Sequence, residues 1–318
     1  MLYLLTGLGS SVGVEIHEEK AFLSWMREYK HMYIGDEYFF RLGIYMTNKR
    51  YIQEHNRGDY SYKLGENQFT AFSPSEYQTL LSSESRIERK TKGSPLKLPY
   101  RDLPSSFDWR TKGVITPVKD QKECVAGWAF SCAGLQESMW AILKNELIPC
   151  SVAQVIDCDW DAHACNGGTN DGGSFFVLYE EDAIWMTEEE YPYQPEKGTC
   201  KFDKTKAHQT FLDLHYAMNE TDMAHMIAEY GVISFGYDCS LSTFTYYKDG
   251  VYDDPSCDMW NLCHYMLIVG YGTENGKDYW LSKNSFGTTW GIDGYCKLVR
   301  NKNGQCGIDL LTYTHLID

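Results

Sequence analysis

The sequence has no apolar run that approaches the roughly 18 residues needed to cross a bilayer. It also has no excess of positive charge, because 29 Lys and Arg stand against 44 Asp and Glu, for a net charge of −15. Nucleic-acid phosphates would repel such a chain. Internal repeats and low-complexity tracts are absent too. What is present is 318 residues with 43% hydrophobic content, which predicts two domains, or one large domain with an extension.

Eleven cysteines are many for a reducing compartment, and they predict a disulfide framework in an exported protein. An apolar stretch followed by small residues predicts a signal peptide over residues 1–16, although a basic start is missing. We therefore expect a secreted protein, or one held in a lysosome-like or vacuole-like compartment. We expect it to be a monomer with no metal and no cofactor. Asn219 begins one glycosylation sequon.

Two helices are expected near the N-terminus. Phe22, Trp25, Met26 and Tyr29 recur at helical spacing and form one apolar face. A second helix is predicted from about residue 37 to residue 55, where several side chains share one face. These side chains are Arg41, Tyr45, Asn48, Ile52 and Asn56. The pattern predicts a helical N-terminal domain over residues 17–82.

A change of composition follows this domain. Residues 83–102 are polar, basic and nearly free of aromatic side chains, which predicts a linker and a processing region. A new body is predicted over residues 103–318, with a helical half to about residue 212 and a strand-rich half from about residue 213. Its first helix is expected to begin near Gly127, followed by Gly- and Cys-rich loops. Asn275-Gly276, between two apolar runs, predicts a hairpin.

Three parts of a thiol-protease active site occur in a plausible order. Catalysis by a thiolate needs a cysteine at a helix N-terminus, a histidine base, a residue that orients the base, and donors for the oxyanion. Gln121 precedes the predicted helix, His264 lies at the edge of a strand-like run, and Asn284 follows the next such run. In the stretch QKECVAGWAFS, however, Gly127 stands where the nucleophile is needed. A glycine cannot attack a carbonyl or form an acyl intermediate.

Several motifs carry a resemblance to a known family. Residues 37–56 follow the pattern E-x3-R-x3-F-x2-N-x3-I-x3-N, with Tyr45 in place of Phe, and GENQFTA ends in Ala71 where Asp is usual. The stretches LPSSFDWR, CNGG, HYMLIVGYG, KNSFGTTWG and QCGI then occur in family order. The chain resembles the papain-like cysteine peptidases, in particular their cathepsin L-like branch. This resemblance implies an α+β fold with a helical left domain, a β-barrel-like right domain, a cleft between them and an N-terminal helical inhibitory prodomain.

The resemblance also implies roles for single residues. Gln121 would be the oxyanion-hole side chain, Gly127 the position of the lost nucleophile, His264 the base, and Asn284 the residue that orients the base. The implied substrate-binding residues are Asn166, Gly167, Gly168, Tyr265, Trp290 and Leu311, with Trp290 as the indole that shields the Asn284–His264 bond. The implied disulfides are Cys124–Cys165, Cys158–Cys200 and Cys257–Cys306. Five cysteines stay unassigned: Cys132, Cys150, Cys239, Cys263 and Cys296.

Three functions are compatible with this pattern. The first is a pseudo-peptidase that binds extended peptides or proteins, and its own prodomain, in the cleft without hydrolysing them. The second is an active cysteine endopeptidase, either because Gly127 is not native or because another thiol such as Cys263 substitutes. The third is a structural or surface protein with an idle cleft. Tyr265 and Leu311 are expected to crowd the main specificity pocket. Without a thiolate partner, His264 is expected to titrate as a plain or partly buried imidazole.

Overall fold

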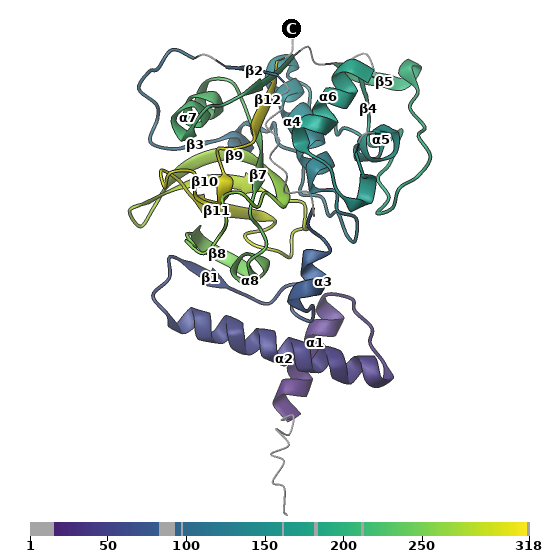
Figure 1. Ribbon diagram of the computed structural model, residues 1–318, viewed down its shortest axis with the longest axis vertical. Helices are drawn as coiled ribbons and strands as arrows, with labels where there is room; N and C mark the ends of the chain where they lie inside the picture. The colour runs from purple at the N-terminus through teal and green to yellow at the C-terminus, as the bar shows by residue number, and fades with distance from the viewer. Residues whose placement is uncertain are drawn as a thin grey trace, which may run out of the picture.

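The computed structural model describes residues 16–82, 93–96, 98–160, 162–180, 184–210 and 213–316. The predicted signal peptide, apart from Ile16, and the first part of the predicted linker lie outside the described residues. The chain has an α+β fold (Figure 1). A helical N-terminal unit lies at one end, and a helical half and a sheet-based half pack side by side above it. Within the described residues, no helix is both long and apolar enough to span a bilayer.

Both helices predicted near the N-terminus are present, as α1 (Ile16–Glu28) and α2 (Gly35–Arg57). We refer to residues 17–82 as the prodomain. Asn48, on the predicted shared face of α2, donates from its amide to the carbonyls of Thr70 and Phe72, both at 2.9 Å. The apolar faces of the two helices meet in a small separate core that contains Phe22, Trp25, Met26, Leu42, Tyr45, Met46 and Ala71.

The prodomain is joined to the main body by a strand. β1 (Tyr62–Leu64) pairs antiparallel with β8 (Tyr247–Tyr252). Asn67 extends this connection, because its amide donates to the Thr245 carbonyl at 2.7 Å and its carbonyl accepts from the Trp25 indole at 2.8 Å. The prodomain therefore shares a sheet and a hydrogen-bond network with the body that it covers.

The helical half contains α4 (Gly127–Lys144), α5 (Val152–Cys158) and α6 (Asn170–Glu180). α4 begins at the predicted residue. Gly- and Cys-rich loops were predicted after α4, and α5 and α6 correct this prediction. α5 is short and begins at a serine cap, since the Ser151 side chain accepts from the Gln154 backbone N–H. Its few residues give too little helical periodicity to stand out from the surrounding Gly- and Cys-rich segments.

The strand-rich half is built on a ten-stranded sheet with the order β1-β8-β11-β10-β9-β7-β12-β6-β2, and β3 pairs with β9 off this path. The predicted hairpin is formed by β9 (His264–Glu274) and β10 (Lys277–Lys283). Asn275 and Gly276 have φ values of +51° and +78°, as a tight hairpin turn requires. The other strands of this sheet are β2 (Ser94–Pro95), β3 (Phe107–Asp108), β6 (Asp213–Tyr216), β7 (Ile233–Tyr237), β11 (Tyr295–Val299) and β12 (Thr312–Leu316).

Shorter elements complete the described chain. α7 (Glu220–Glu229) lies in the half predicted to be strand-like, and Asn219 of the sequon caps it by accepting from the Asp222 N–H. β4 and β5 form a small sheet in the half predicted to be helical. The remaining bounds are α3 (Pro74–Gln78), α8 (Ser242–Thr245), β4 (Ile184–Met186), β5 (Ala207–Thr210), η1 (Trp109–Lys112), η2 (Ala164–Asn166), η3 (Lys204–Lys206) and η4 (Gln305–Gly307).

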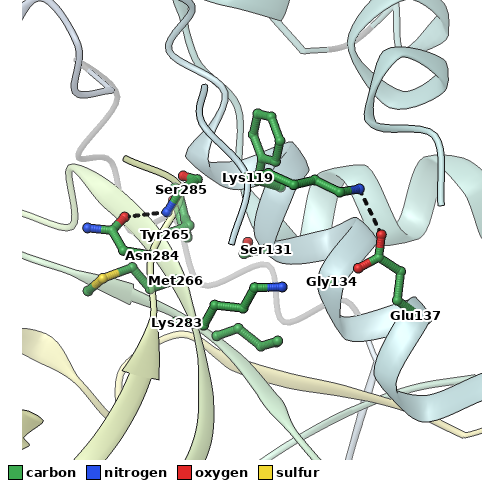
Figure 2. A pocket seen from close by; sticks show the side chains of 11 residues that line it. Lys119, Ser131, Gly134, Glu137, Tyr265, Met266, Lys283, Asn284 and Ser285 are labelled. Carbon is green, nitrogen blue, oxygen red and sulfur yellow. Dashed lines mark hydrogen bonds and ion pairs between the residues drawn. The ribbon is translucent and has the colours of Figure 1, made fainter. Parts of the chain in front are cut away.

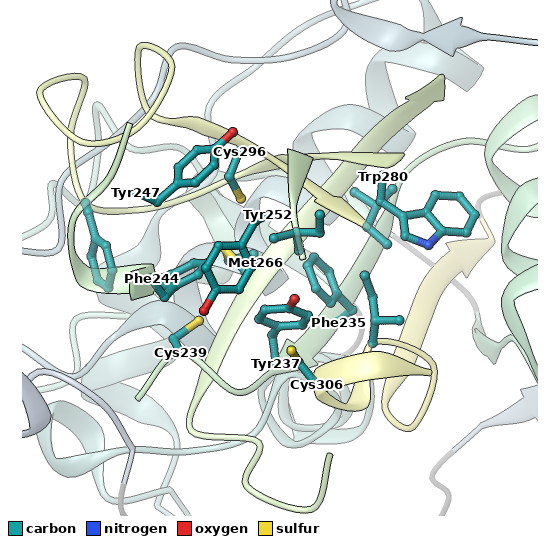
Figure 3. Close-up of a cluster of buried hydrophobic side chains, with 14 of the residues drawn as sticks. Phe235, Tyr237, Cys239, Phe244, Tyr247, Tyr252, Met266, Trp280, Cys296 and Cys306 are labelled. Atoms are coloured by element: carbon teal, nitrogen blue, oxygen red, sulfur yellow. The ribbon is translucent and has the colours of Figure 1, made fainter. Parts of the chain in front are cut away.

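The main core fills the sheet half and continues into the prodomain, through residues such as Phe69, Tyr77 and Leu80. Figure 3 shows aromatic and sulfur-containing side chains converging there, among them Phe235, Tyr252, Met266 and Trp280. A second core joins α4 to the sheet half and contains Trp128, Ala133 and Tyr265. These two cores hold the N-terminus of α4 against the start of β9, where the predicted site residues lie.

Candidate active site

The structure brings the four predicted catalytic positions together. Gly127 is the first residue of α4, and His264 is the first residue of β9. Asn284 directly follows β10, the hairpin partner of β9. Gln121, in the loop before α4, is linked to Ser285 next to Asn284, because its backbone N–H donates to the Ser285 carbonyl at 2.8 Å. Motifs that are far apart in the sequence therefore meet at one place in the fold.

His264 is held by Asn284 in a buried pair. The imidazole Nε2 lies 2.8 Å from Asn284 Oδ1, and the His264 residue is 2% exposed. With the amide oxygen facing the ring, Nε2 donates the hydrogen and Nδ1 carries a lone pair. Burial lowers the pKa of His264 to about 4, against the opposing effect of the Asn284 hydrogen bond. The base is therefore neutral at neutral pH, in the direction expected for an imidazole without a thiolate partner.

This buried imidazole is expected to make the protein less stable in mild acid. The pKa of His264 is lowered from 6.5 to about 4, so between these values only the unfolded chain binds the proton. The contribution of neutral His264 to the free energy of unfolding is fully present above pH 6.5 and is lost as the pH drops toward 4. The loss between pH 7 and pH 5 is on the order of 2 kcal/mol. Burial also lowers the pKa of His315, to about 3, which adds a loss of the same sign.

Two measurements check this expectation. The ring-proton chemical shift of His264 should keep its neutral-form value from pH 7 to pH 5. In urea unfolding, His264→Gln should reduce the difference in unfolding free energy between pH 7 and pH 5, leaving the part due to His315. A His264 ring that titrates with a midpoint near 6.5 would contradict the burial argument.

Gly127 leaves the imidazole without a reaction partner. A Cβ atom at Gly127 would lie 2.4 Å from His264 Cε1 and 2.6 Å from Nδ1. Both separations are shorter than real Cβ contacts, so the ring occupies the space that a side chain at this position would need. The base is therefore packed directly against the glycine backbone at the N-terminus of α4.

Gln121 is fixed in place and already has a carbonyl partner. Its side-chain Oε1 accepts from Ser285 Oγ at 2.8 Å, so the amide cannot turn freely. Its Nε2 donates to the Cys124 carbonyl at 2.9 Å and to the Leu80 carbonyl at 3.2 Å. Leu80 belongs to the prodomain. The predicted oxyanion donor thus contacts a peptide carbonyl supplied by the chain itself.

The prodomain chain continues along the same surface. The Ser82 N–H donates to the Cys263 carbonyl at 2.8 Å, next to His264. Ser82 Oγ lies so close to Gly167 that a Cβ there would be 2.7 Å away, and Gly167 has a φ of +124° that favours glycine. Gly168 faces Trp128, whose ring atoms would lie 2.7 Å from a Cβ. At Gly167, therefore, the absence of a side chain lets the prodomain residue Ser82 approach the backbone closely.

Phe286, rather than Trp290, covers the imidazole. The Phe286 ring stacks on His264 with a centroid distance of 4.6 Å and an interplanar angle of 19°. Trp290 packs edge-on against Phe286 at 5.7 Å, and its indole N–H donates to the carbonyls of Phe244 and Thr245. The prediction that Trp290 shields the Asn284–His264 bond is corrected in this respect. Both aromatic residues lie in the same short motif, and their spacing alone does not say which one reaches the ring.

Tyr265 and Leu311, which the resemblance assigns to the specificity pocket, are both buried. Tyr265 is 2% exposed and Leu311 is 9% exposed, and both belong to the core that joins α4 to the sheet half. Leu262 is buried in the same cluster. The Tyr265 ring also packs over Gly236, the residue opposite it on β7. These side chains are therefore part of the packed interior.

A small cavity lies behind the site, between α4 and the ends of β9 and β10 (Figure 2). Its volume of about 20 Å³ is enough for one water molecule. Lys119 pairs with the buried Glu137 at 2.9 Å, and Lys283 donates to Thr116 Oγ1 at 2.9 Å. Burial lowers the pKa of Lys283 to about 8, with Glu137 opposing this effect. This network ties the end of β10, and with it Asn284, to α4; sequence spacing did not reveal it.

The cysteines fall into two groups. The three implied disulfides are present, as Cys124–Cys165, Cys158–Cys200 and Cys257–Cys306. The unassigned cysteines are buried thiols outside these disulfides: Cys132, Cys150, Cys239, Cys263 and Cys296. Burial raises the pKa of both Cys132 and Cys263 to about 12, so neither thiol is ionised near neutral pH.

Cys132 lies on the same helix as Gly127, and Cys263 directly precedes His264, but the sulfur atoms of both contact other groups. Cys132 contacts Ser174 Oγ at 3.0 Å, within the helical half. The Cys263 sulfur accepts from the Cys239 N–H at 3.4 Å and lies 3.6 Å from Asp238 Oδ1. Within the described residues, no group of three or more His, Cys, Asp or Glu side chains is arranged to hold a metal ion.

Two family models match the chain. Residues 103–315 match the papain family cysteine protease model, and residues 22–77 match the cathepsin propeptide inhibitor domain. Together the two matched segments cover most of the described residues.

Curated relatives and solved structures agree with these matches. Cathepsin L1 of Drosophila melanogaster is 38% identical over 288 residues, covering 85% of this chain and 77% of that protein. Pro-cathepsin H of Mus musculus is 36% identical over 315 residues, covering 96% of this chain and 92% of that protein. The structure of digestive procathepsin L2 proteinase from the Tenebrio molitor larval midgut superposes with a TM-score of 0.88 at 32% identity, covering 94% of this chain and 100% of that one.

Proposed function

The chain belongs to the papain family of cysteine proteases as a cathepsin L-like zymogen, and we propose that it has lost hydrolysis while keeping the ability to bind extended peptides. The observation that carries this proposal is the contact between Gly127 and His264. The nucleophile position has no side chain, and the imidazole fills the space in which one would stand. In a serine-protease precedent, loss of the nucleophile lowers turnover by on the order of 10⁶-fold.

The binding part of the proposal rests on the prodomain segment in the cleft. Two of its backbone groups, the Leu80 carbonyl and the Ser82 N–H, bond to the Gln121 amide and the Cys263 carbonyl. These contacts are made by backbone groups and need no thiol, so they are open to the backbone of another bound chain. Tyr265 and Leu311 are large and buried; with the pocket role that the resemblance gives them, we expect the cleft to favour peptides with small side chains at that point.

The proposal also has a consequence for removal of the prodomain. A chain without a nucleophile cannot remove its own prodomain, so removal requires another protease. We place the boundaries of the zymogen as the sequence suggests, with a signal peptide over residues 1–16, the prodomain over residues 17–82 and the papain-like domain from residue 103. A secreted or lysosomal location fits the disulfides, because disulfides persist in oxidising compartments.

Binding without hydrolysis is the expected result for the protein freed of its prodomain by an added protease. A synthetic peptide of residues 74–82 should bind with micromolar affinity in calorimetry, and mass spectrometry should find it uncut after prolonged incubation. An epoxide that labels active-site thiols should not modify the protein. In Gln121→Leu, the loss of one donor to the peptide carbonyl should weaken binding by about 3–10-fold.

Each alternative function gives a different outcome in this experiment. Turnover with stoichiometric thiol labelling would support an active endopeptidase that uses one of the free cysteines. No binding of the peptide, to wild-type protein or to the variant, would support a structural protein with an idle cleft. Either result would overturn the proposed function.

A further inference from the structure

The second half of the predicted linker lies on the main body as a strand. β2 pairs parallel with β6, with Ser94 opposite His215 and Pro95 opposite Tyr216. The pairing continues one residue further, because the Leu96 N–H donates to the Tyr216 carbonyl at 3.0 Å. The composition of this segment predicted a linker, and the structure shows that the segment is part of the sheet.

β2 occupies one end of the ten-stranded sheet. The order of the sheet begins with β1 of the prodomain and ends with β2. Segments that precede the papain-like domain therefore cover both β8 and β6, which would otherwise be edge strands. Exposed edge strands present unpaired N–H and C=O groups and promote association with other chains. Keeping β2 in place would leave the β6 edge covered after the prodomain has gone.

Side chains that follow β2 in the chain also hold this segment on the main body. Leu96 and Leu98 pack against the main core of the sheet half. Tyr100 reaches α7, where its hydroxyl donates to Asp222 Oδ1 at 2.8 Å and its ring lies 5.0 Å from the ring of His225. We call residues 93–100 the strap; Lys97 within it lies outside the described residues. The strap thus has backbone, apolar and polar contacts with the papain-like domain.

Gly93 allows the chain to pass close to β6. Its φ is +97°, in the region that favours glycine. A Cβ at Gly93 would lie 2.3 Å from the Leu214 carbonyl oxygen, which is a backbone atom of β6 that cannot rotate away. The chain can therefore approach β6 this closely only if residue 93 has no side chain.

We propose that the strap is a permanent part of the mature body, so that removal of the prodomain by another protease leaves residues 93–100 attached as the N-terminal edge strand. A protease must hold its substrate as an extended, unpaired segment. Within the strap, that would require breaking the β2–β6 pairing and lifting Leu96 and Leu98 from the core. The mature N-terminus therefore lies at or before Gly93, upstream of the boundary near residue 103 that composition suggests. This inference does not depend on whether the protein hydrolyses peptides.

Limited digestion of the full-length protein with subtilisin, followed by intact-mass analysis of the stable fragment, tests the proposal. For wild-type protein we expect a fragment that begins at or before Gly93. In Gly93→Ala the new methyl group collides with Leu214, so the strap should detach and the fragment should begin after Tyr100. Gly113→Ala is the matched control, because Gly113 also has a positive φ of +71° but has open space around its Cβ position. Its fragment should match that of wild type.

Amide hydrogen exchange gives a second measurement on the uncut protein. The Leu96 N–H should exchange at least tenfold more slowly in wild-type protein and in Gly113→Ala than in Gly93→Ala, because only the detached strap loses the bond to Tyr216. A wild-type fragment that begins at Leu96 or later would overturn the proposal. The same fragment N-terminus in all three proteins would also overturn it.

Discussion

Replacing Gly127 with cysteine is expected to give the prodomain-free protein measurable peptidase turnover, on the order of 10²–10³-fold above that of the wild-type protein. The rest of the machinery is in place. Asn284 orients the imidazole at 2.8 Å, and Ser285 fixes the Gln121 amide at 2.8 Å. A thiol at residue 127 would stand at the N-terminus of α4, where the helix dipole favours the thiolate.

The gain is expected to be smaller than the full loss of about 10⁶-fold that removal of a nucleophile causes elsewhere. The new Cβ would lie 2.4 Å from His264 Cε1, so the imidazole must tilt away from α4. That movement disturbs its stacking on Phe286. A crystal structure of Gly127→Cys should therefore show a displaced His264 ring that keeps its bond to Asn284.

A matched control separates a restored active site from a newly introduced thiol. Gly134 lies on the same helix and is also buried, and the nearest atom to its Cβ position is Leu267 Cδ2 at 3.5 Å. Gly134→Cys should therefore fold and show no turnover. Adding His264→Ala to Gly127→Cys should abolish the regained activity. Equal turnover in the two cysteine variants, or turnover by the wild-type protein itself, would contradict the role assigned to Gly127.

The long helices and the main hairpin could be predicted from the sequence because each has a strong local signal. The apolar face of α1 recurs at helical spacing, and Asn275-Gly276 supplies the positive φ values that a tight turn requires. α5 and β2 could not be predicted. α5 is only seven residues long, and β2 has two residues that form a strand only because β6 is beside them. Such elements depend on tertiary contacts rather than on local preference.

The sequence predicted which residues form the candidate site, but it did not predict how their side chains pack. The order of the motifs placed Gln121, His264 and Asn284 at one point, and the structure brings them together. The position of the imidazole against Gly127 depends on packing by Phe286 from another element, and sequence spacing carries no information about that packing. The buried pair of Lys119 and Glu137 was missed for the same reason, because its two residues come from different parts of the chain.

The prodomain closes the cleft through Leu80 and Ser82. We expect the loss of Arg41 to weaken this closure more than any other single replacement in the prodomain. Its guanidinium pairs with Glu76 at 2.7 and 2.8 Å and donates to the Ala71 carbonyl at 3.0 Å. Glu76 also accepts from the Ser73 N–H at 2.8 Å as part of the cap of α3. α3 leads directly to Leu80 in the cleft, so the pair connects the prodomain core to the segment that covers the site.

Arg41→Met is expected to destabilise the prodomain by about 2–3 kcal/mol, since a bidentate and partly buried ion pair is lost while the apolar stem is kept. The Arg41 side chain is 16% exposed and that of Glu76 is 36% exposed, so solvent screening keeps the effect at this level. Arg50→Met is the matched control. Arg50 lies on the same helix and pairs with Glu18 of α1 at 2.9 Å, but its side chain is 55% exposed. Its replacement should cost no more than about 0.5 kcal/mol.

Urea unfolding followed by the NMR signal of the Trp25 indole N–H, which lies in the prodomain and donates to the Asn67 carbonyl, should show the difference between the two variants. Hydrogen exchange at the Ser82 amide should show the functional consequence. Because this N–H is bonded to the Cys263 carbonyl at 2.8 Å, its exchange reports opening of the cleft and should accelerate about 30–160-fold in Arg41→Met, the factor that 2–3 kcal/mol implies. Equal effects of Arg41→Met and Arg50→Met would show that the Arg41–Glu76 pair does not govern closure, and that β1 and Asn67 hold the prodomain on the body without it.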